Sequence, residues 1–332
     1  MSFLKSIIAN FGPKKFMIIV KKTHSERENM KIGVIGYGNM GSMIVNNILK
    51  LNLLLDDEEL IVSNRHLNKF ESLIEEYPEE NLNITSDNKE VATQCQKILI
   101  SVETPQFKEI IEEIKPFLNE NTHIIYTCAG LNFNHIKQYF DGKLSLVIPT
   151  LASTVTSNNS ISSLARRKGV TLVKHNSKVE LQERLFVEDL FNEFSYVRRI
   201  DNPIYFNEEE NNLDPSDNEL EMSTIISSCG PAFIAILMDK FAQSCSEASN
   251  IPKDDIENMV LKTVIGTTML KDDQGLSNED IINKVATKGG ITQEGVDLLD
   301  KKFNKISKAL IRTLLTRYDE VNDEMNKTYL KK

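Results

Sequence analysis

The chain has 332 residues, of which 40% are hydrophobic and 26% are charged, and its formal net charge is −9. This length and composition are typical of a soluble protein of about two domains, and they exclude a collagen, a rod-like coiled coil and a wholly disordered chain. We expect no membrane and no nucleic-acid partner, because no run approaches the roughly 18 uninterrupted apolar residues of a membrane span and an acidic chain without a basic stripe binds phosphates poorly.

Residues 1–29 differ from the rest of the chain, since they carry six basic and only two acidic side chains. Their apolar pieces are too short for the hydrophobic region of a signal peptide. We interpret this segment as a basic tail or as a spurious start that precedes an initiator at Met30. A basic targeting or membrane-touching segment is the remaining alternative.

Short apolar runs alternate with helical patterns from Met30 to about residue 200. The first run, Lys31 to Ile35, is followed by a helical pattern over Ser42 to Leu51. Alternating strands and helices favour a parallel sheet that is covered on both faces. We therefore predict an α/β domain over residues 30–200 with a doubly wound parallel sheet of the Rossmann type. Its further strands are predicted at 59–63, 97–102, 123–127, 144–148 and 170–173, and its further helices at 70–77 and 107–118.

Residues 201–221 interrupt this pattern with eight acids and no lysine or arginine, so we expect an acidic linker there. The chain beyond the linker is helical, and we predict an all-helical domain over residues 222–325. Its first helix, at 222–249, is apolar almost all round, which predicts burial on several sides or against a second copy of the chain. Later helices are predicted at 256–270, after the capping box Ser277-Asn-Glu-Asp280, and along an apolar stripe from Val296 to Leu314.

A glycine-rich turn follows the first predicted strand. Its residues, Gly36, Tyr37, Gly38, Asn39, Met40 and Gly41, fit the pattern G-x-G-x-x-G. The first glycine suits a tight turn, the second lets a pyrophosphate approach the backbone, and the third lets helix and strand pack closely. We predict dinucleotide binding here. The alternative is a glycine-rich turn in an unrelated doubly wound sheet.

The end of the second predicted strand indicates which dinucleotide binds. An NAD site usually places Asp or Glu about 20 residues beyond the glycines, but this chain has Ser63-Asn64-Arg65-His66. No acid is present to repel a 2′-phosphate, and a guanidinium could pair with it. We therefore predict NADP(H) as the cofactor, with Asn64 and Arg65 at its 2′-phosphate. The alternative is that Arg65 is an ordinary exposed residue at the start of a helix.

A second glycine segment, Thr287-Lys288-Gly289-Gly290-Ile291-Thr292, lies between two predicted helices. Adjacent glycines leave backbone N–H groups open, and a helix start adds partial positive charge, so the loop could hold a carboxylate. A plain turn between helices, capped by Thr292, is the alternative.

These two segments, together with Ser227-Ser228-Cys229-Gly230-Pro231-Ala232-Phe233, resemble the Δ1-pyrroline-5-carboxylate reductase family. That family carries a G-x-G-N-M-G turn, an S-G-S-G-P-A-Y helix start and an S-P-G-G-T-T-like loop in the same order. Ile100-Ser-Val-Glu-Thr-Pro-Gln106 resembles its A-V-K-P-Q segment, and Ala129-Gly130 resembles its A-A-G. The resemblance extends over nearly the whole chain beyond the basic tail.

The resemblance implies an oxidoreductase of proline biosynthesis that acts on CH–NH bonds. NADPH would reduce the C=N bond of pyrroline-5-carboxylate, or of a close cyclic imino acid, to give L-proline. The helical domain would form a homodimer or a higher oligomer. The cofactor contacts would extend from the first glycine turn to Val102, and the substrate carboxylate would lie on Gly289, Gly290, Ile291 and Thr292, with the Thr292 hydroxyl at the ring nitrogen as the catalytic group.

The chain also departs from the family. The family's M-P-N-T-P run appears as Ile148-Pro149-Thr150-Leu151-Ala152, and Glu103-Thr104 replaces the lysine of V-K-P-Q. The S-C-G-P-A-F and K-G-G variants resemble the late-competence (ComER-type) branch. A catalytically altered NADP-binding paralogue with a competence-linked or regulatory role is therefore the alternative function. A β-hydroxyacid dehydrogenase would need an asparagine pair after its catalytic lysine, and Lys240 lacks one.

The remaining candidate side chains predict no further chemistry. None of the five histidines pairs with another histidine or a cysteine at helical spacing, so no metal site is predicted. The four cysteines form no C-x-x-C pair, and we expect reduced thiols in a cytoplasmic protein. Cys229 is interpreted as a small core residue rather than a nucleophile.

Overall fold

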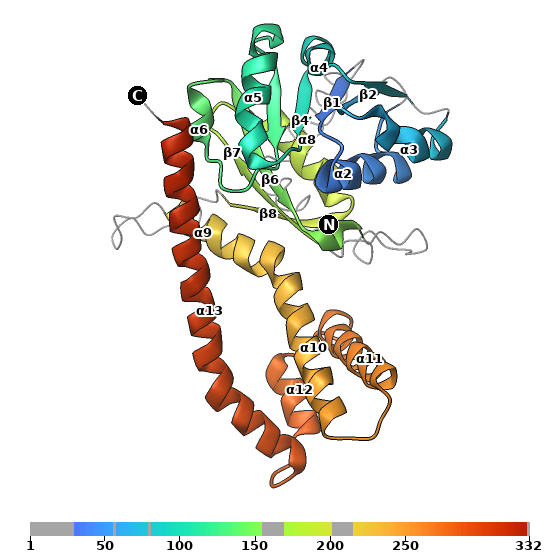
Figure 1. Ribbon diagram of the computed structural model, residues 1–332, viewed down its shortest axis with the longest axis vertical. Coiled ribbons are helices and arrows are strands. Elements are labelled where there is room, and N and C mark those ends of the chain that lie inside the picture. The colour runs from blue at the N-terminus through green and yellow to red at the C-terminus, as the bar shows by residue number, and fades with distance from the viewer. Residues whose placement is uncertain (1–29, 56–57, 79–80, 155–168, 201–214, 331–332) are drawn as a thin grey trace, which may run out of the picture. The chain divides into compact units, whose positions relative to one another are not determined.

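The computed structural model describes residues 30–55, 58–78, 81–154, 169–200 and 215–330 (Figure 1). The predicted tail at 1–29 and most of the predicted acidic linker lie outside these ranges. The chain divides into two compact units. The first unit runs to Thr224 and is rejoined by Glu320–Lys332, and the second unit is Ile225–Asp319.

A mostly parallel sheet organises the first unit, with the strand order β3-β2-β1-β4-β5-β6-β7-β8 among the described residues. Every neighbouring pair is parallel except β6 and β7, which are antiparallel. The predicted doubly wound sheet is therefore confirmed, with one antiparallel pair and two edge strands, β3 and β8, that were not predicted. The strands are β1 Lys31–Ile35, β2 Glu59–Ser63, β3 Leu82–Thr85, β4 Lys97–Ile100, β5 His123–Tyr126, β6 Lys143–Pro149, β7 Gly169–His175 and β8 Ser195–Arg199.

Helices cover both faces of this sheet. One face packs against α2 and α8, and the other face packs against α4, α5 and α6. The strands are therefore apolar on both sides, which is why they read as nearly continuous hydrophobic runs. The helical segments are α2 Asn39–Lys50, η1 Leu67–Phe70, α3 Glu71–Glu76, α4 Asn88–Gln94, α5 Thr104–Ile114, η2 Lys115–Phe117, α6 Phe133–Lys137, η3 Leu151–Thr154, α8 Leu181–Asn192 and α9 Pro215–Thr224.

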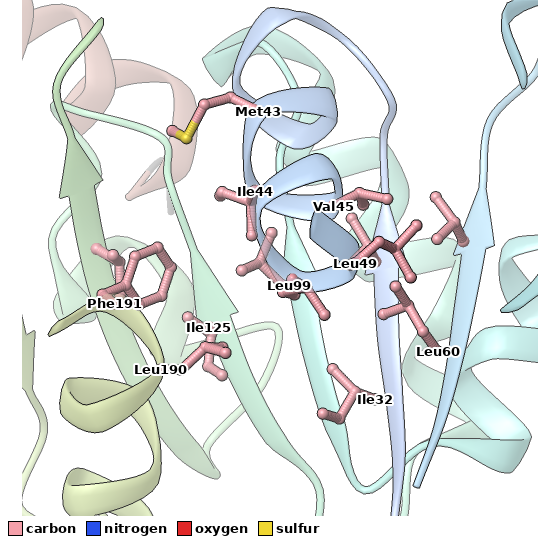
Figure 2. Packing of buried hydrophobic residues seen from close by; sticks show 14 of the residues in the cluster. Ile32, Met43, Ile44, Val45, Leu49, Leu60, Leu99, Ile125, Leu190 and Phe191 are labelled. Carbon is pink, nitrogen blue, oxygen red and sulfur yellow. The ribbon is translucent and has the colours of Figure 1, made fainter. Parts of the chain in front are cut away.

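The α2 face of the sheet carries one of its two core clusters. Ile44, Val45 and Leu49 of α2 pack against Ile32 of β1 and Leu60 of β2 (Figure 2). All five side chains are nearly inaccessible to solvent. Burial of each such side chain stabilises the fold by roughly 1.5–3 kcal/mol, so the helix that follows the glycine turn is firmly anchored to the sheet.

A buried polar chain lies on the α8 face of the sheet. The Ser145 hydroxyl on β6 lies 2.7 Å from His123 Nε2 on β5 and 2.6 Å from His175 Nδ1 on β7. Glu188 of α8 bonds both His175 Nε2, at 3.2 Å, and the Arg199 guanidinium, at 2.7 Å and 2.5 Å. The charge of the buried carboxylate is thus compensated, as a buried charge requires.

The second unit is entirely helical among its described residues. A π-helical turn, η5 Ile225–Cys229, leads into α10 Gly230–Glu247, and α11 Lys253–Asp272 packs against α10. The predicted capping box is confirmed at the start of α12, Asn278–Val285. The Asp280 N–H donates to Ser277 Oγ at 3.0 Å, and the Ser277 N–H donates to Asp280 Oδ2 at 2.9 Å. The last helix, α13, spans Ile291–Tyr329.

The predicted burial of the helix at 222–249 is wrong for the single chain. Ala242 is the buried residue of α10, whereas Phe241 is 63% exposed and Ile234 is 55% exposed. The stretch Glu219–Glu247 is also long and apolar enough to cross a membrane, by length and composition alone. Within one chain, most apolar side chains of this helix are therefore not buried as its sequence predicts.

Candidate functional site

The first glycine turn joins β1 to α2 at the carboxyl edge of the sheet. It lies between β2 and β4, where the strand order reverses and where ligands of such sheets bind. Gly36 has a φ of +98°, and a Cβ atom there would lie 2.3 Å from the Ser101 carbonyl oxygen. Its N–H donates to the Ser63 carbonyl at 2.9 Å. Only glycine therefore suits this position.

The second and third glycines of the turn differ in the space that a side chain would have. A Cβ atom added at Gly38 would meet no described atom within 4 Å, whereas one at Gly41 would lie 2.0 Å from the Gly36 carbonyl oxygen. Gly38 also caps α2 without any side-chain hydrogen bond, so the first N–H groups of the helix remain for an anion. The turn thus fits a pyrophosphate at Gly38 and close helix packing at Gly41.

The two residues predicted at the 2′-phosphate follow β2, next to this turn. Asn64 Oδ1 accepts the Tyr37 N–H at 3.3 Å, and Asn64 Nδ2 donates to the His66 carbonyl at 3.1 Å. Asn64 therefore holds the turn in place, a role that the sequence did not predict. Arg65 is exposed, and no ion pair joins it to an acid among the described residues. Its guanidinium is free to meet a phosphate.

Val102 contacts the turn from the other side. A Cβ atom at Gly36 would lie 2.8 Å from Val102 Cγ1. The Cys128 thiol, after β5, donates to the Val102 carbonyl at 3.2 Å. Burial raises the pKa of Cys128 to about 12, so the thiol stays protonated as a structural donor. The loops after β1, β4 and β5 thus lie side by side at one edge of the sheet.

The altered segment after β6 is held by its own substituted residue. Thr150 is 3% exposed, and its Oγ1 accepts the Val170 N–H at 3.0 Å. The Thr150 N–H in turn donates to the Val170 carbonyl at 3.0 Å. Thr150, which stands where the family that the sequence resembles has asparagine, therefore ties the end of β6 to β7.

The second glycine loop precedes α13 in the second unit. Gly289 has a φ of +74°, and the Gly290 N–H donates to the Thr287 carbonyl at 2.9 Å. The following residues, Ile291 and Thr292, are exposed, and their N–H groups donate to no described protein atom. Open N–H groups at a helix start are suited to a carboxylate.

No group of three or more His, Cys, Asp or Glu side chains that could hold a metal ion occurs among the described residues. The candidate groups of the first unit are the backbone donors of the glycine turn and the exposed Arg65, and those of the second unit are the backbone donors of the second glycine loop and the exposed Thr292 hydroxyl.

Two family models match the chain. The model described as pyrroline-5-carboxylate reductase dimerisation matches residues 217–321, and the model described as NADP oxidoreductase coenzyme F420-dependent matches residues 31–130. The pyrroline-5-carboxylate reductase of Methanobrevibacter smithii is 37% identical over 273 residues, which are 82% of this chain and 98% of that protein. ComE operon protein 4 of Bacillus subtilis (strain 168) is 21% identical over 291 residues, 88% and 96% of the two chains.

Solved structures share the fold. A pyrroline-5-carboxylate reductase from Coxiella burnetii gives a TM-score of 0.71 at 20% identity and covers 90% of this chain and 99% of its own. The Plasmodium falciparum pyrroline carboxylate reductase, crystallised with NADP bound, gives a TM-score of 0.67 at 21% identity, with 89% and 98% covered. Both similarities extend over the two units of the chain.

Proposed function

The chain belongs to the pyrroline-5-carboxylate reductase family, and we propose that it reduces the C=N bond of pyrroline-5-carboxylate, or of a close cyclic imino acid, to L-proline with NADPH. The observation that carries this function is the glycine turn with an open Gly38. It occurs in a chain that matches the Methanobrevibacter smithii reductase along nearly all of that enzyme's length. The reaction places the protein in proline biosynthesis.

The first unit supplies the cofactor site. The uncapped N-terminus of α2 and the open Gly38 receive the pyrophosphate, and Arg65 pairs with the 2′-phosphate. The wall of the cofactor site is completed by Tyr37, Asn39, Met40 and Val102. When bound, NADPH supplies the hydride that adds to the imine carbon.

The second glycine loop supplies the substrate site in this proposal. The open N–H groups of Ile291 and Thr292, with that of Gly289, hold the substrate carboxylate, while Gly290, whose N–H donates to the Thr287 carbonyl, shapes the loop around it. The Thr292 hydroxyl hydrogen-bonds the ring nitrogen, which takes a proton from water as its carbon gains hydride from NADPH. An imine that is held in position needs little further acid–base machinery. This agrees with a loop that offers backbone donors and one hydroxyl.

A second copy of the chain is the proposed macromolecular partner. The dimerisation model covers 217–321, and the helices in this range expose large apolar side chains such as Phe241, Leu299 and Phe303. A homodimer through these helices, or a higher oligomer built from it, buries the apolar side chains that α10 exposes in the single chain. This accounts for the apolar helix without a membrane, and we place the enzyme in the cytoplasm, where its four free cysteines stay reduced.

The alternative, a cofactor-binding paralogue with a competence-linked or regulatory role, is not favoured. The likeness to ComE operon protein 4 is at 21% identity, well below the 37% identity with a named reductase. The substituted Thr150 is accommodated by hydrogen bonds rather than leaving a disrupted segment.

The test compares Thr292→Ala with Thr313→Ala, a control on the same helix whose hydroxyl bonds only the Ala309 carbonyl. Loss of one transition-state hydrogen bond near a developing charge costs about 10²–10³ in kcat. We expect that loss for Thr292→Ala in NADPH oxidation with pyrroline-5-carboxylate, and unchanged kinetics for Thr313→Ala. Equal kcat values for the two variants would show that the Thr292 hydroxyl takes no part in the reaction.

A further inference from the structure

The last turns of α13, from Glu320 on, belong to the first unit and lie beside α6 (Figure 1). Tyr329 is only 2% exposed and ranks among the largest fully buried side chains, and Met325 packs against the same core cluster. The dimerisation family model ends at residue 321. The buried end of α13 therefore lies beyond the part of the chain that the family model matches.

Tyr329 reaches the start of α5. Its hydroxyl donates to the Thr104 carbonyl at 3.2 Å, and its ring lies 5.9 Å from the rings of His135 and Tyr139. Burial raises the pKa of Tyr329 to about 12, so the phenol keeps its proton at neutral pH. The Thr104 hydroxyl donates to the Ala129 carbonyl at 3.3 Å. The tyrosine thus supports the residue that ties the loop after β4 to the loop after β5.

Asn326 holds the start of α6. The fully buried His135 accepts the Asn132 N–H on Nδ1 at 3.2 Å, so its ring carries the proton on Nε2. That proton is donated to Asn326 Oδ1 at 2.9 Å. One turn earlier, Val321 lies against Gly130, where an added Cβ atom would be 3.2 Å from Val321 Cγ1. Three side chains of α13 therefore fix the ends of the loops after β4 and β5.

These loops lie on the nicotinamide side of the cofactor site. In a doubly wound sheet the pyrophosphate lies on the turn after β1, and the adenosine ribose lies at the end of β2. The other half of the dinucleotide therefore extends toward β4 and β5. Val102, in the loop after β4, already contacts the glycine turn. Movement of this loop would displace the wall beside the reacting ring.

We propose that residues 321–329 form a C-terminal latch that positions the loops after β4 and β5 around the nicotinamide, with Asn326 and Tyr329 as positioning residues for hydride transfer. This inference rests on the proposed function, because it requires NADPH at this edge of the sheet. The latch is expected to act on one half of the cofactor, since the Asn326 and Tyr329 hydrogen bonds join it to α6 and to the start of α5, beside the loops after β5 and β4.

The experiment uses the full chain with Tyr329→Phe and Asn326→Ala. Their matched controls are Tyr196→Phe, at a 59% exposed tyrosine, and Asn322→Ala, at an exposed residue one turn earlier on α13. Affinity is measured for NADPH and for 2′-phospho-ADP-ribose, which lacks the nicotinamide. Initial rates with pyrroline-5-carboxylate give kcat and KM, and thermal unfolding gives Tm. The phenylalanine variant keeps the buried ring, so it folds even where a truncation would not.

The latch predicts that Tyr329→Phe and Asn326→Ala weaken NADPH binding by about three- to tenfold, the effect of one lost hydrogen bond. Affinity for 2′-phospho-ADP-ribose stays unchanged, and kcat falls at saturating NADPH. A lower Tm with unchanged binding and kinetics would overturn the proposal, as would equal loss of both ligands. Because the binding comparison needs no imino acid, a wild-type chain that binds NADPH without turnover would contradict the proposed function while the latch is still tested.

Discussion

Three glycines within six residues have three different backbone environments in the turn between β1 and α2. Gly36 adopts a positive φ, Gly41 lies against a backbone carbonyl, and Gly38 borders open space. The motif in the sequence predicted each of these roles, because each follows from local backbone geometry. The motif could not predict that Asn64 would hold the Tyr37 N–H, since that bond joins residues brought together only by the pairing of β1 with β2.

These surroundings predict different outcomes for the same substitution. Gly38→Ala introduces a methyl group that meets no described atom, at a φ of −88° that alanine readily adopts. We expect its free energy of unfolding to change by less than about 1 kcal/mol, while NADPH affinity falls at least about tenfold because the methyl group occupies the approach of the pyrophosphate.

Gly41→Ala is the matched variant. Its methyl group would lie 2.0 Å from the Gly36 carbonyl oxygen, so the helix or the turn must shift. Overpacking of this kind destabilises a fold by about 1–3 kcal/mol. Denaturant unfolding and NADPH titration of both variants separate the two effects. A lower free energy of unfolding for Gly38→Ala than for wild type would contradict an open site at Gly38. An unchanged NADPH affinity of this variant would contradict it as well.

At the scale of elements, strongly apolar strands were predictable and short or polar elements were not. β8 was missed because its sequence, Ser195 to Arg199, carries two arginines. One of them, Arg199, donates a hydrogen bond to Glu188 of α8. The antiparallel direction of β7 was also missed, since an apolar run carries no sign of its direction. The strands β5, β6 and β7 bring together the buried chain of His123, Ser145 and His175, which ends on Glu188 of α8 and which no motif indicates.

This polar chain predicts how stability depends on pH. Burial lowers the pKa of His123 well below its ordinary value of 6.5, assisted by the nearby charges of Lys97, His175 and Lys143. The folded state therefore keeps His123 neutral while the unfolded state binds a proton, so stability falls as the pH drops below about 6.5. Burial opposes ionisation of Glu188, but hydrogen bonds from His175 and Arg199 outweigh it and lower its pKa, so its contribution is lost only below about pH 4.5.

The measurement is the free energy of unfolding of wild type and His123→Asn between pH 8 and pH 5. The wild type should lose more stability than the variant between pH 6.5 and pH 5, by up to about 2 kcal/mol, the limit for one proton that only the unfolded chain binds. The difference between the two proteins should be constant above pH 7.5. Parallel curves over the whole range would show that His123 titrates alike in both states.

For the whole molecule, the sequence predicted the helical second unit and an apolar first helix that is buried on several sides or against a second copy of the chain. Large apolar side chains on α10, α11 and α13 are exposed, among them Phe241, Met269 and Phe303. Periodicity shows that a helix face is buried but cannot show which molecule buries it. The match to the dimerisation family model over 217–321 supports the proposal that a second copy of the chain buries this face.

The dimer predicts that Phe241→Glu dissociates the protein into monomers, because a buried unpaired carboxylate is strongly unfavourable in an apolar interface. Gln243→Glu adds the same charge to an exposed polar position of α10 and should leave the assembly intact. Light scattering at micromolar concentration gives the mass of each protein. A monomeric wild type, or a dimeric Phe241→Glu variant, would contradict assembly through α10.

The proposed reductase activity is tested by the rate at which the purified full chain converts pyrroline-5-carboxylate to proline, with NADPH and with NADH compared under the same conditions. We expect one proline formed for each NADPH oxidised, and a kcat/KM for NADPH at least about tenfold above that for NADH, since only NADPH offers a 2′-phosphate to Arg65. Tight binding of NADPH without any proline formed would contradict the reductase function.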